Sequence, residues 1–222
     1  MSRHTTRAAA RKPEFRLAAL GTAKEAIGTL DPGVRIVGVT KGQFGLLEII
    51  RAIVEQTGPA HLVLATWGLG KDDVEHVEAM VERGDVTGVE ILTDRSVPTR
   101  HNDQFIAACR LFGGENVWLT RLHAKFVMIR AGNWRIVIRS SMNLNANPRL
   151  EQFDIDDDEA IFNFYQEIVD ELKRDLSSGE LYINRPEAAK RNTEQVFRDI
   201  FTEKKTKKRT SVKRPPRRRR WS

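Results

Sequence analysis

Short apolar segments alternate along the chain with segments in which apolar residues recur at helical spacing, and short turns join them. Leu46, Ile49, Ile50 and Ile53, for example, occupy the i, i+3, i+4 and i+7 positions of an amphipathic helix. Alternating strands and helices with short connections pack in layers, so we expect an α/β sandwich with a mixed β-sheet flanked by helices. Strands are expected over residues 34–40, 61–66, 89–93, 117–120, 122–129, 134–139 and 153–155, and further helices over residues 15–27, 72–84, 105–112 and 160–176.

The length of 222 residues suits one well-buried domain and is too short for two large ones. The single cysteine, Cys109, cannot form an internal disulfide, which fits a reducing compartment. Because the chain also lacks an apolar run of about 18 residues, a cytoplasmic location without membrane insertion is expected. The expected organisation is a mobile basic N-terminal segment (1–14), an α/β domain (15–185), a linking helix (186–202) and a disordered basic tail (203–222).

The positive charge of the chain is concentrated in this tail. The net charge is +7, yet eleven Lys and Arg residues follow Glu203, so the first 202 residues carry a slight excess of acid. The tail has almost no apolar residue to bury, and it is expected to bind the phosphates of nucleic acid, with an affinity that falls as salt rises. The alternative is a solvated tail that aids solubility. The predicted nucleic-acid-binding residues are Lys204, Lys205, Lys207, Lys208, Arg209, Lys213, Arg214, Arg217, Arg218, Arg219 and Arg220.

Two polar residues, His123 and Lys125, interrupt the otherwise apolar strand expected over residues 122–129. Residues two apart in a strand project from the same face, so both side chains would point the same way. Residues 130–133 predict a hairpin turn, and residues 134–139 the returning strand. The expected pairing places His123 opposite Ser140.

Ser141 and Asn143 would then leave the sheet beside His123. An imidazole, an ammonium, a hydroxyl and a carboxamide at one place suit a phosphodiester, with the imidazole as nucleophile and Lys125 and the amide as donors to oxygens that gain negative charge. Glu151 is a candidate carboxylate for fixing the imidazole tautomer. The sequence contains no Cys-x-x-Cys, Asp-rich loop or paired His at metal spacing, so a site without metal or cofactor is expected.

Each of these residues also has a purely structural interpretation. His123 could be a core histidine, Ser141 and Asn143 could be turn residues, and Glu151 could be a surface charge. An unpaired lysine in an apolar strand is harder to explain, because burying an ammonium is costly. Three of the four tryptophans are interpreted as core or sheet-surface aromatic residues; they are Trp67, Trp118 and Trp134.

The pattern resembles the His-Lys-Asp motif of the phospholipase D superfamily, which reads His-x-Lys, four residues, Asp, then Gly-Ser-x-Asn and a downstream Glu. The matching positions are His123, Lys125, Ser141, Asn143 and Glu151. The resemblance covers roughly residues 34–176 and implies the phospholipase D-like α/β sandwich. It also implies that these five residues are catalytic.

Two positions depart from the motif. Arg130 stands where the family has Asp, and Ser140 where it has Gly. The resemblance implies that the Asp supports the motif and does not attack the substrate. Its loss therefore leaves the residues with chemical roles in place.

The motif occurs once in this chain, whereas in the family two motifs meet in one site. One His attacks phosphorus there, and the other protonates the leaving oxygen. A single copy therefore predicts a homodimer with His123 of each subunit at the symmetry axis. The predicted function is a metal-independent nuclease with a phosphohistidine intermediate, with DNA favoured over RNA. The alternative is a catalytically degenerate nucleic-acid-binding protein; lipid hydrolysis is disfavoured because no amphipathic membrane segment is found.

Overall fold

The computed structural model describes residues 12–18, 21–144 and 148–178. The chain divides into two units, residues 1–174 and 175–222, and the account below concerns the first. The predicted linking helix and the basic tail lie outside the described residues. Within the described part, no helix is long and apolar enough to cross a membrane.

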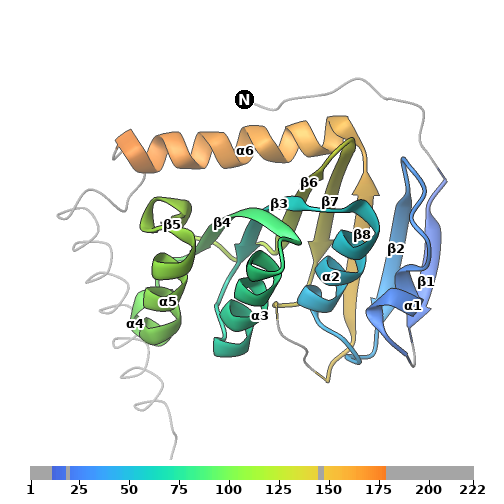
Figure 1. Ribbon diagram of the computed structural model, residues 1–222, viewed down its shortest axis with the longest axis horizontal. Coiled ribbons are helices and arrows are strands. Elements are labelled where there is room, and N and C mark those ends of the chain that lie inside the picture. The colour runs from blue at the N-terminus through green and yellow to red at the C-terminus, as the bar shows by residue number, and fades with distance from the viewer. Residues whose placement is uncertain (1–11, 19–20, 145–147, 179–222) are drawn as a thin grey trace, which may run out of the picture. The chain divides into compact units, whose positions relative to one another are not determined.

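An eight-stranded mixed sheet forms the centre of the first unit (Figure 1). Its strands lie side by side in the order β1-β2-β8-β7-β6-β3-β4-β5. The pairs β1/β2, β3/β4 and β4/β5 are parallel, and the other neighbours are antiparallel. The strands are β1 (Glu14–Ala18), β2 (Arg35–Thr40), β3 (Ala60–Thr66), β4 (Val86–Asp94), β5 (Val117–Thr120), β6 (Phe126–Ala131), β7 (Trp134–Ser140) and β8 (Glu151–Asp157).

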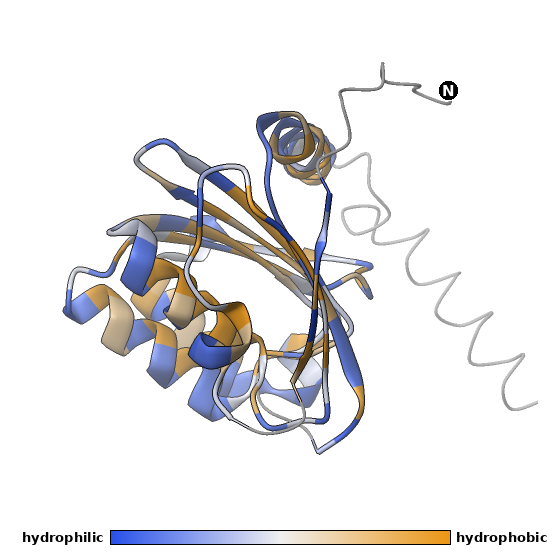
Figure 2. Ribbon diagram, turned by 90° about the vertical axis from the view of Figure 1, so that its right-hand side faces the viewer, coloured by the Kyte–Doolittle hydropathy of each residue, from blue (hydrophilic) through white to orange (hydrophobic). Residues whose placement is uncertain are grey.

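Helices cover both faces of this sheet (Figures 1 and 2). They are α1 (Ala23–Ile27), α2 (Leu46–Thr57), α3 (Lys71–Glu82), α4 (Val97–Arg100), α5 (Asn102–Phe112) and α6 (Glu159–Ser178), with a 3₁₀ turn η1 (Gly114–Asn116). Helix α6 lies on one face, and α1, α2, α3 and α5 pack on the other. The predicted α/β class, with a mixed sheet flanked by helices, is confirmed.

The central strands read as continuous apolar runs because both of their faces are buried. In β3, Leu62 and Leu64 pack in the core under α1, α2, α3 and α5, whereas Val63 and Ala65 pack in the core under α6. The α6 core is completed by residues such as Phe162 and is separate from the larger one. The alternation of side chains along a strand thus supplies two cores from one run of residues.

The helix predicted over residues 15–27 is wrong in its first half. Residues Glu14–Ala18 form strand β1, which pairs in parallel with β2 at the edge of the sheet. Helix α1 begins only at Ala23, because the Thr22 hydroxyl accepts a hydrogen bond from the Glu25 N–H at 3.2 Å in a capping box. Phe15 and Leu17, which fall within the predicted helix, are 76% and 70% exposed on this edge strand.

Substitution of Gly38 by Ala should destabilise the sheet between β2 and β8. Gly38 lies opposite Phe153, and a Cβ at Gly38 would lie 2.2 Å from Cζ of that ring. Phe153 is 1% exposed and packs edge-on against Phe44, so the ring cannot move into solvent. We expect the free energy of unfolding in urea to fall by about 1–3 kcal/mol, as for other overpacked cores.

Gly114→Ala is the matched control, because a Cβ there meets no atom within 4 Å. Its free energy of unfolding should stay within about 0.5 kcal/mol of the original. Phe153→Leu, introduced into the Gly38→Ala chain, should recover part of the loss by making room. Equal unfolding midpoints for Gly38→Ala and Gly114→Ala would refute the steric argument.

Candidate active site

The predicted site residues lie at one end of the strands, where some strands of the sheet finish and their antiparallel neighbours begin. Strands β2, β3, β4, β5 and β7 end at this place, and β6 and β8 begin there, as the antiparallel pairings require. We call the described segments at this place, one of which contains the short helix α4, the loop edge; they are residues 41–45, 67–70, 95–101, 121–125, 141–144 and 148–150. It contains six cationic residues and no Asp or Glu. The cations are Lys41, Arg95, Arg100, Arg121, Lys125 and Arg149.

The hairpin of β6 and β7 differs from the predicted register by two residues. Its turn is Gly132-Asn133, and Gly132 has a φ of 49°, a conformation that favours glycine. Arg130 therefore belongs to the strand instead of the turn, and the Ser140 N–H donates to the Lys125 carbonyl at 3.1 Å. The predicted pairing of His123 with Ser140 is wrong, but a shift of two keeps each side chain on its expected face.

His123 and Lys125 lie in the loop before β6, which begins at Phe126, and not within a strand as predicted. The Lys125 ammonium donates to the His123 carbonyl at 3.0 Å. His123 is exposed, and its ring meets that of Trp67 edge-on, with centroids 6.0 Å apart. The lysine therefore does not sit in an apolar strand, and its charge is next to the backbone of the histidine.

The structure brings Ser141 and Glu151 together across the start of β8. The Ser141 hydroxyl donates to the Glu151 carboxylate, and it accepts from the Gln152 N–H at 3.0 Å. The carbonyl of Gln152 accepts from the Ser141 N–H at 3.1 Å. Backbone and side-chain hydrogen bonds to Gln152 therefore both fix the position of Ser141 beside Glu151. Among the contacts of the described residues, none joins Glu151 to His123, and the predicted support of the imidazole by Glu151 stays a prediction.

Asn143 follows Ser141 in the same loop. Among the described residues, its amide oxygen is one of a few buried side-chain atoms without a hydrogen-bond partner. The adjacent Leu144 carbonyl accepts from the Leu47 N–H at 3.1 Å, which ties the loop to the start of α2. A buried amide with an unused acceptor is energetically costly, so Asn143 is not an ordinary exposed turn residue.

Asp94, at the end of β4, orients the segment that carries His123. Its carboxylate accepts hydrogen bonds from the Ser96 N–H at 2.9 Å and the Leu122 N–H at 3.4 Å, and also from the Ser96 hydroxyl. Partial burial raises the pKa of Asp94, but these hydrogen bonds outweigh it and hold the pKa below its usual value. The sequence signal for this role was an acidic residue at a strand end with Ser two positions later.

Arg130, at the motif's Asp position, lies away from the loop edge. It is opposite His61 in β3 and Arg135 in β7, four residues along β6 from Phe126. Its guanidinium donates to the Gln166 amide oxygen at 3.1 Å and lies 5.3 Å from the centre of the Phe162 ring. Arg130 therefore joins the sheet to α6, and its replacement of an acid changes nothing at His123 directly.

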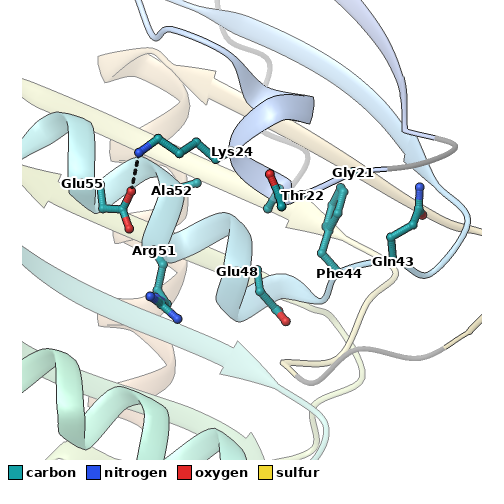
Figure 3. Close-up of a pocket in the computed structure, with 10 residues that line it drawn as sticks. Gly21, Thr22, Lys24, Gln43, Phe44, Glu48, Arg51, Ala52 and Glu55 are labelled. Atoms are coloured by element: carbon teal, nitrogen blue, oxygen red, sulfur yellow. Dashed lines mark hydrogen bonds and ion pairs between the residues drawn. The ribbon is translucent and has the colours of Figure 1, made fainter.

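A pocket of about 450 Å³ lies between α1 and α2 (Figure 3). Two cationic and two acidic residues line it, and Lys24 is paired to Glu55 at 3.0 Å. None of the five predicted catalytic residues contributes to it. The candidate site is therefore the open loop edge and not this pocket.

No protein-family model matches the chain, and no curated protein matches its sequence. Among solved structures, it is similar to TrmBL2, an archaeal chromatin protein with a novel mode of DNA binding, at a TM-score of 0.38 and 15% identity over 61% of this chain and 50% of that one. It is also similar to the phosphatidylserine synthase of Haemophilus influenzae Rd KW20, at a TM-score of 0.38 and 16% identity over 79% of this chain and 48% of that one. The chain thus spans about half the length of each protein, and both likenesses are distant ones of fold, which assign no activity to it.

Proposed function

We propose that the chain is a metal-independent phosphodiesterase that cleaves nucleic acid, with DNA favoured over RNA, in a site formed by two copies. One observation carries the proposal. The loop that bears His123 and Lys125 is hydrogen-bonded to the end of β7, where the Ser141–Glu151 pair follows. The side chains of His123 and Lys125 and the Ser141–Glu151 pair therefore come from neighbouring segments of the loop edge.

In the proposed mechanism a ring nitrogen of His123 attacks phosphorus. A P–N bond forms and the P–O bond to the leaving group breaks, while His123 of the partner subunit donates a proton to the leaving oxygen. Water then attacks the phosphohistidine and gives its proton to the partner subunit's His123, which restores both histidines. Lys125 and the Asn143 amide donate to the phosphoryl oxygens as negative charge grows on them.

The charge of the loop edge favours a polyanionic substrate. The described segments of the loop edge contain six cations and no carboxylate. The two flanking carboxylates, Asp94 and Glu151, each accept a hydrogen bond from a serine hydroxyl. The eleven cations after Glu203, which lie outside the described residues, would add sequence-independent affinity for phosphates. We therefore propose nucleic acid, and not a small phosphodiester, as the substrate class.

Incubation of the full-length protein with single-stranded DNA, duplex DNA and RNA, in buffer that contains a chelator, tests the proposal. We expect cleavage with an unchanged rate when the chelator is added. Denaturation in alkaline detergent during turnover of end-labelled substrate should trap label on the protein in a form that is stable in base and released by acid, as a phosphohistidine requires. Cleavage that disappears in chelator, or turnover that never leaves labelled protein, would refute the mechanism.

A second candidate function is nucleic-acid binding without catalysis. Two observations favour it, because position 130 lacks the motif's acid and, among the described contacts, no carboxylate touches the His123 imidazole. In that case the same preparations would bind DNA and RNA with strong salt dependence but give no product from any of them.

A further inference from the structure

Trp67 has an environment unlike that of a core tryptophan. It directly follows β3 in the loop edge and is 38% exposed. Its ring lies next to that of His123, with an angle of 61° between the ring planes. Exposure of a large aromatic side chain costs hydrophobic free energy, so an exposed indole beside a candidate catalytic residue suggests a ligand.

The guanidinium group of Arg100 lies over this indole. Its guanidinium carbon is 3.9 Å from the centre of the Trp67 ring. Two hydrogen bonds hold it there, from Nη2 to the Trp67 carbonyl at 3.2 Å and from Nε to the Ser96 hydroxyl at 2.9 Å. Ser96 is in turn bonded to Asp94, the residue that also orients the His123 segment.

The chain offers a contrast in Trp118, which also has a cation near its ring. The Lys173 ammonium lies 5.8 Å from the Trp118 ring centre and forms an ion pair with Glu90. Trp118 lies on the face of the sheet that α6 covers, and it packs there against the smaller core. That arrangement stabilises packing, whereas the Trp67–Arg100 stack is open to solvent at the loop edge.

We infer that the Trp67–Arg100 stack is a base-binding subsite that selects single-stranded nucleic acid. Nucleobases stack on aromatic rings and on guanidinium planes, and such stacking tolerates any base. A base on this stack would place its neighbouring phosphate at His123, and the inference rests on the proposed function for that position. A base paired within a duplex is already stacked on its neighbours, so it cannot also stack on Trp67 and Arg100.

The test compares two probes of equal length and charge, a fluorescein-labelled oligothymidylate and a labelled oligodeoxynucleotide of abasic residues. Because both carry the same phosphates, the contribution of the basic tail cancels in the ratio of their dissociation constants. Fluorescence anisotropy is measured with the full-length protein in a His123→Asn background, so that the probes stay intact. We expect oligothymidylate to bind more tightly by about 5- to 150-fold.

Trp67→Leu in this background should bring the ratio close to one by weakening only the binding of oligothymidylate. Affinity for a duplex of the same length should not change. Phe164→Leu is the matched control, because Phe164 is an exposed aromatic residue, 51% accessible, on α6; this variant should keep the ratio.

The inference would be overturned if the dissociation constants of the two probes were nearly equal before any change at Trp67. It would also be overturned if their ratio were unchanged in Trp67→Leu. A loss of affinity for both probes and the duplex together would do so as well, since it would mark a folding defect or a phosphate contact. Failure of the nuclease proposal has a different signature. The unsubstituted protein would then leave DNA and RNA intact, while the base-dependent ratio and its loss in Trp67→Leu could still be measured.

Discussion

Replacement of His123 by Asn should lower the rate of nucleic-acid cleavage by roughly 10³-fold or more, because the carboxamide cannot form the phosphorus–nitrogen intermediate. His123 is exposed and contributes to neither hydrophobic core, so the variant should unfold at the same temperature as the original. The measurement is the initial rate on the best substrate, in chelator, with protein purified in parallel.

His76→Asn is the matched control. His76 is an exposed histidine on α3 whose Nδ1 lies 2.6 Å from the Asp72 carbonyl, outside the loop edge. Its rate should stay within about twofold of the original, as expected for a surface position. A His123→Asn preparation that keeps a tenth of the original rate would exclude His123 as the nucleophile.

The same variant tests the shared site. Co-expression of wild-type and His123→Asn chains gives mixed dimers. Only a dimer with two His123 residues can both attack phosphorus and protonate the leaving oxygen. Activity should therefore fall as the square of the fraction of original chains. A linear fall would mean that one subunit suffices, which would contradict the homodimeric site while leaving the nucleophile in place.

The sequence predicted the layers of this fold well because apolar periodicity is a local signal. It failed for the strand at Glu14–Ala18, where pairing with β2 decides the conformation and the residues themselves are nearly all exposed. The hairpin register was missed for a local reason, since Arg130 and Ala131 were assigned to the turn although Gly132-Asn133 alone makes it.

The candidate site was only partly predictable for a related reason. The segments of Lys125 and Ser140 are neighbours in a hairpin, so their proximity follows from short-range pairing. The contact between Trp67 and Arg100 joins residues 33 positions apart on two separate loops, and no periodicity reports it. Side-chain clusters of this kind depend on how strands are ordered in the sheet, which the pattern of the sequence leaves open.

Asp156 should be the most sensitive polar residue of the fold. It is 2% exposed on β8 and lies between two arginines on the neighbouring strands, with Arg35 Nε of β2 at 3.3 Å and Arg139 of β7 in a closer ion pair. Burial raises the pKa of Asp156 above its usual value, against the opposing effect of both arginines. The cluster therefore joins three adjacent strands through one desolvated carboxylate.

Asp156→Asn keeps the shape of the side chain and removes its charge, leaving two partly buried cations without their counterion. Breaking a buried pair in this way costs about 3–5 kcal/mol, and the lower end applies because the arginine side chains are 38% and 33% exposed and can regain water. We expect the free energy of unfolding in urea to fall by about 3 kcal/mol, compared with less than about 0.5 kcal/mol for Asp31→Asn in an exposed loop.

A variant with all three charges replaced, Arg35→Met with Arg139→Met and Asp156→Leu, separates two explanations for such a loss. If unpaired charge is the cause, the triple variant should recover most of the stability, because apolar residues of similar volume pack without desolvation cost. If it stays as unstable as Asp156→Asn, the cluster stabilises the fold through its own attraction between β2, β8 and β7. An Asp156→Asn chain with the original unfolding free energy would contradict both explanations and would mean that water replaces the carboxylate at no cost.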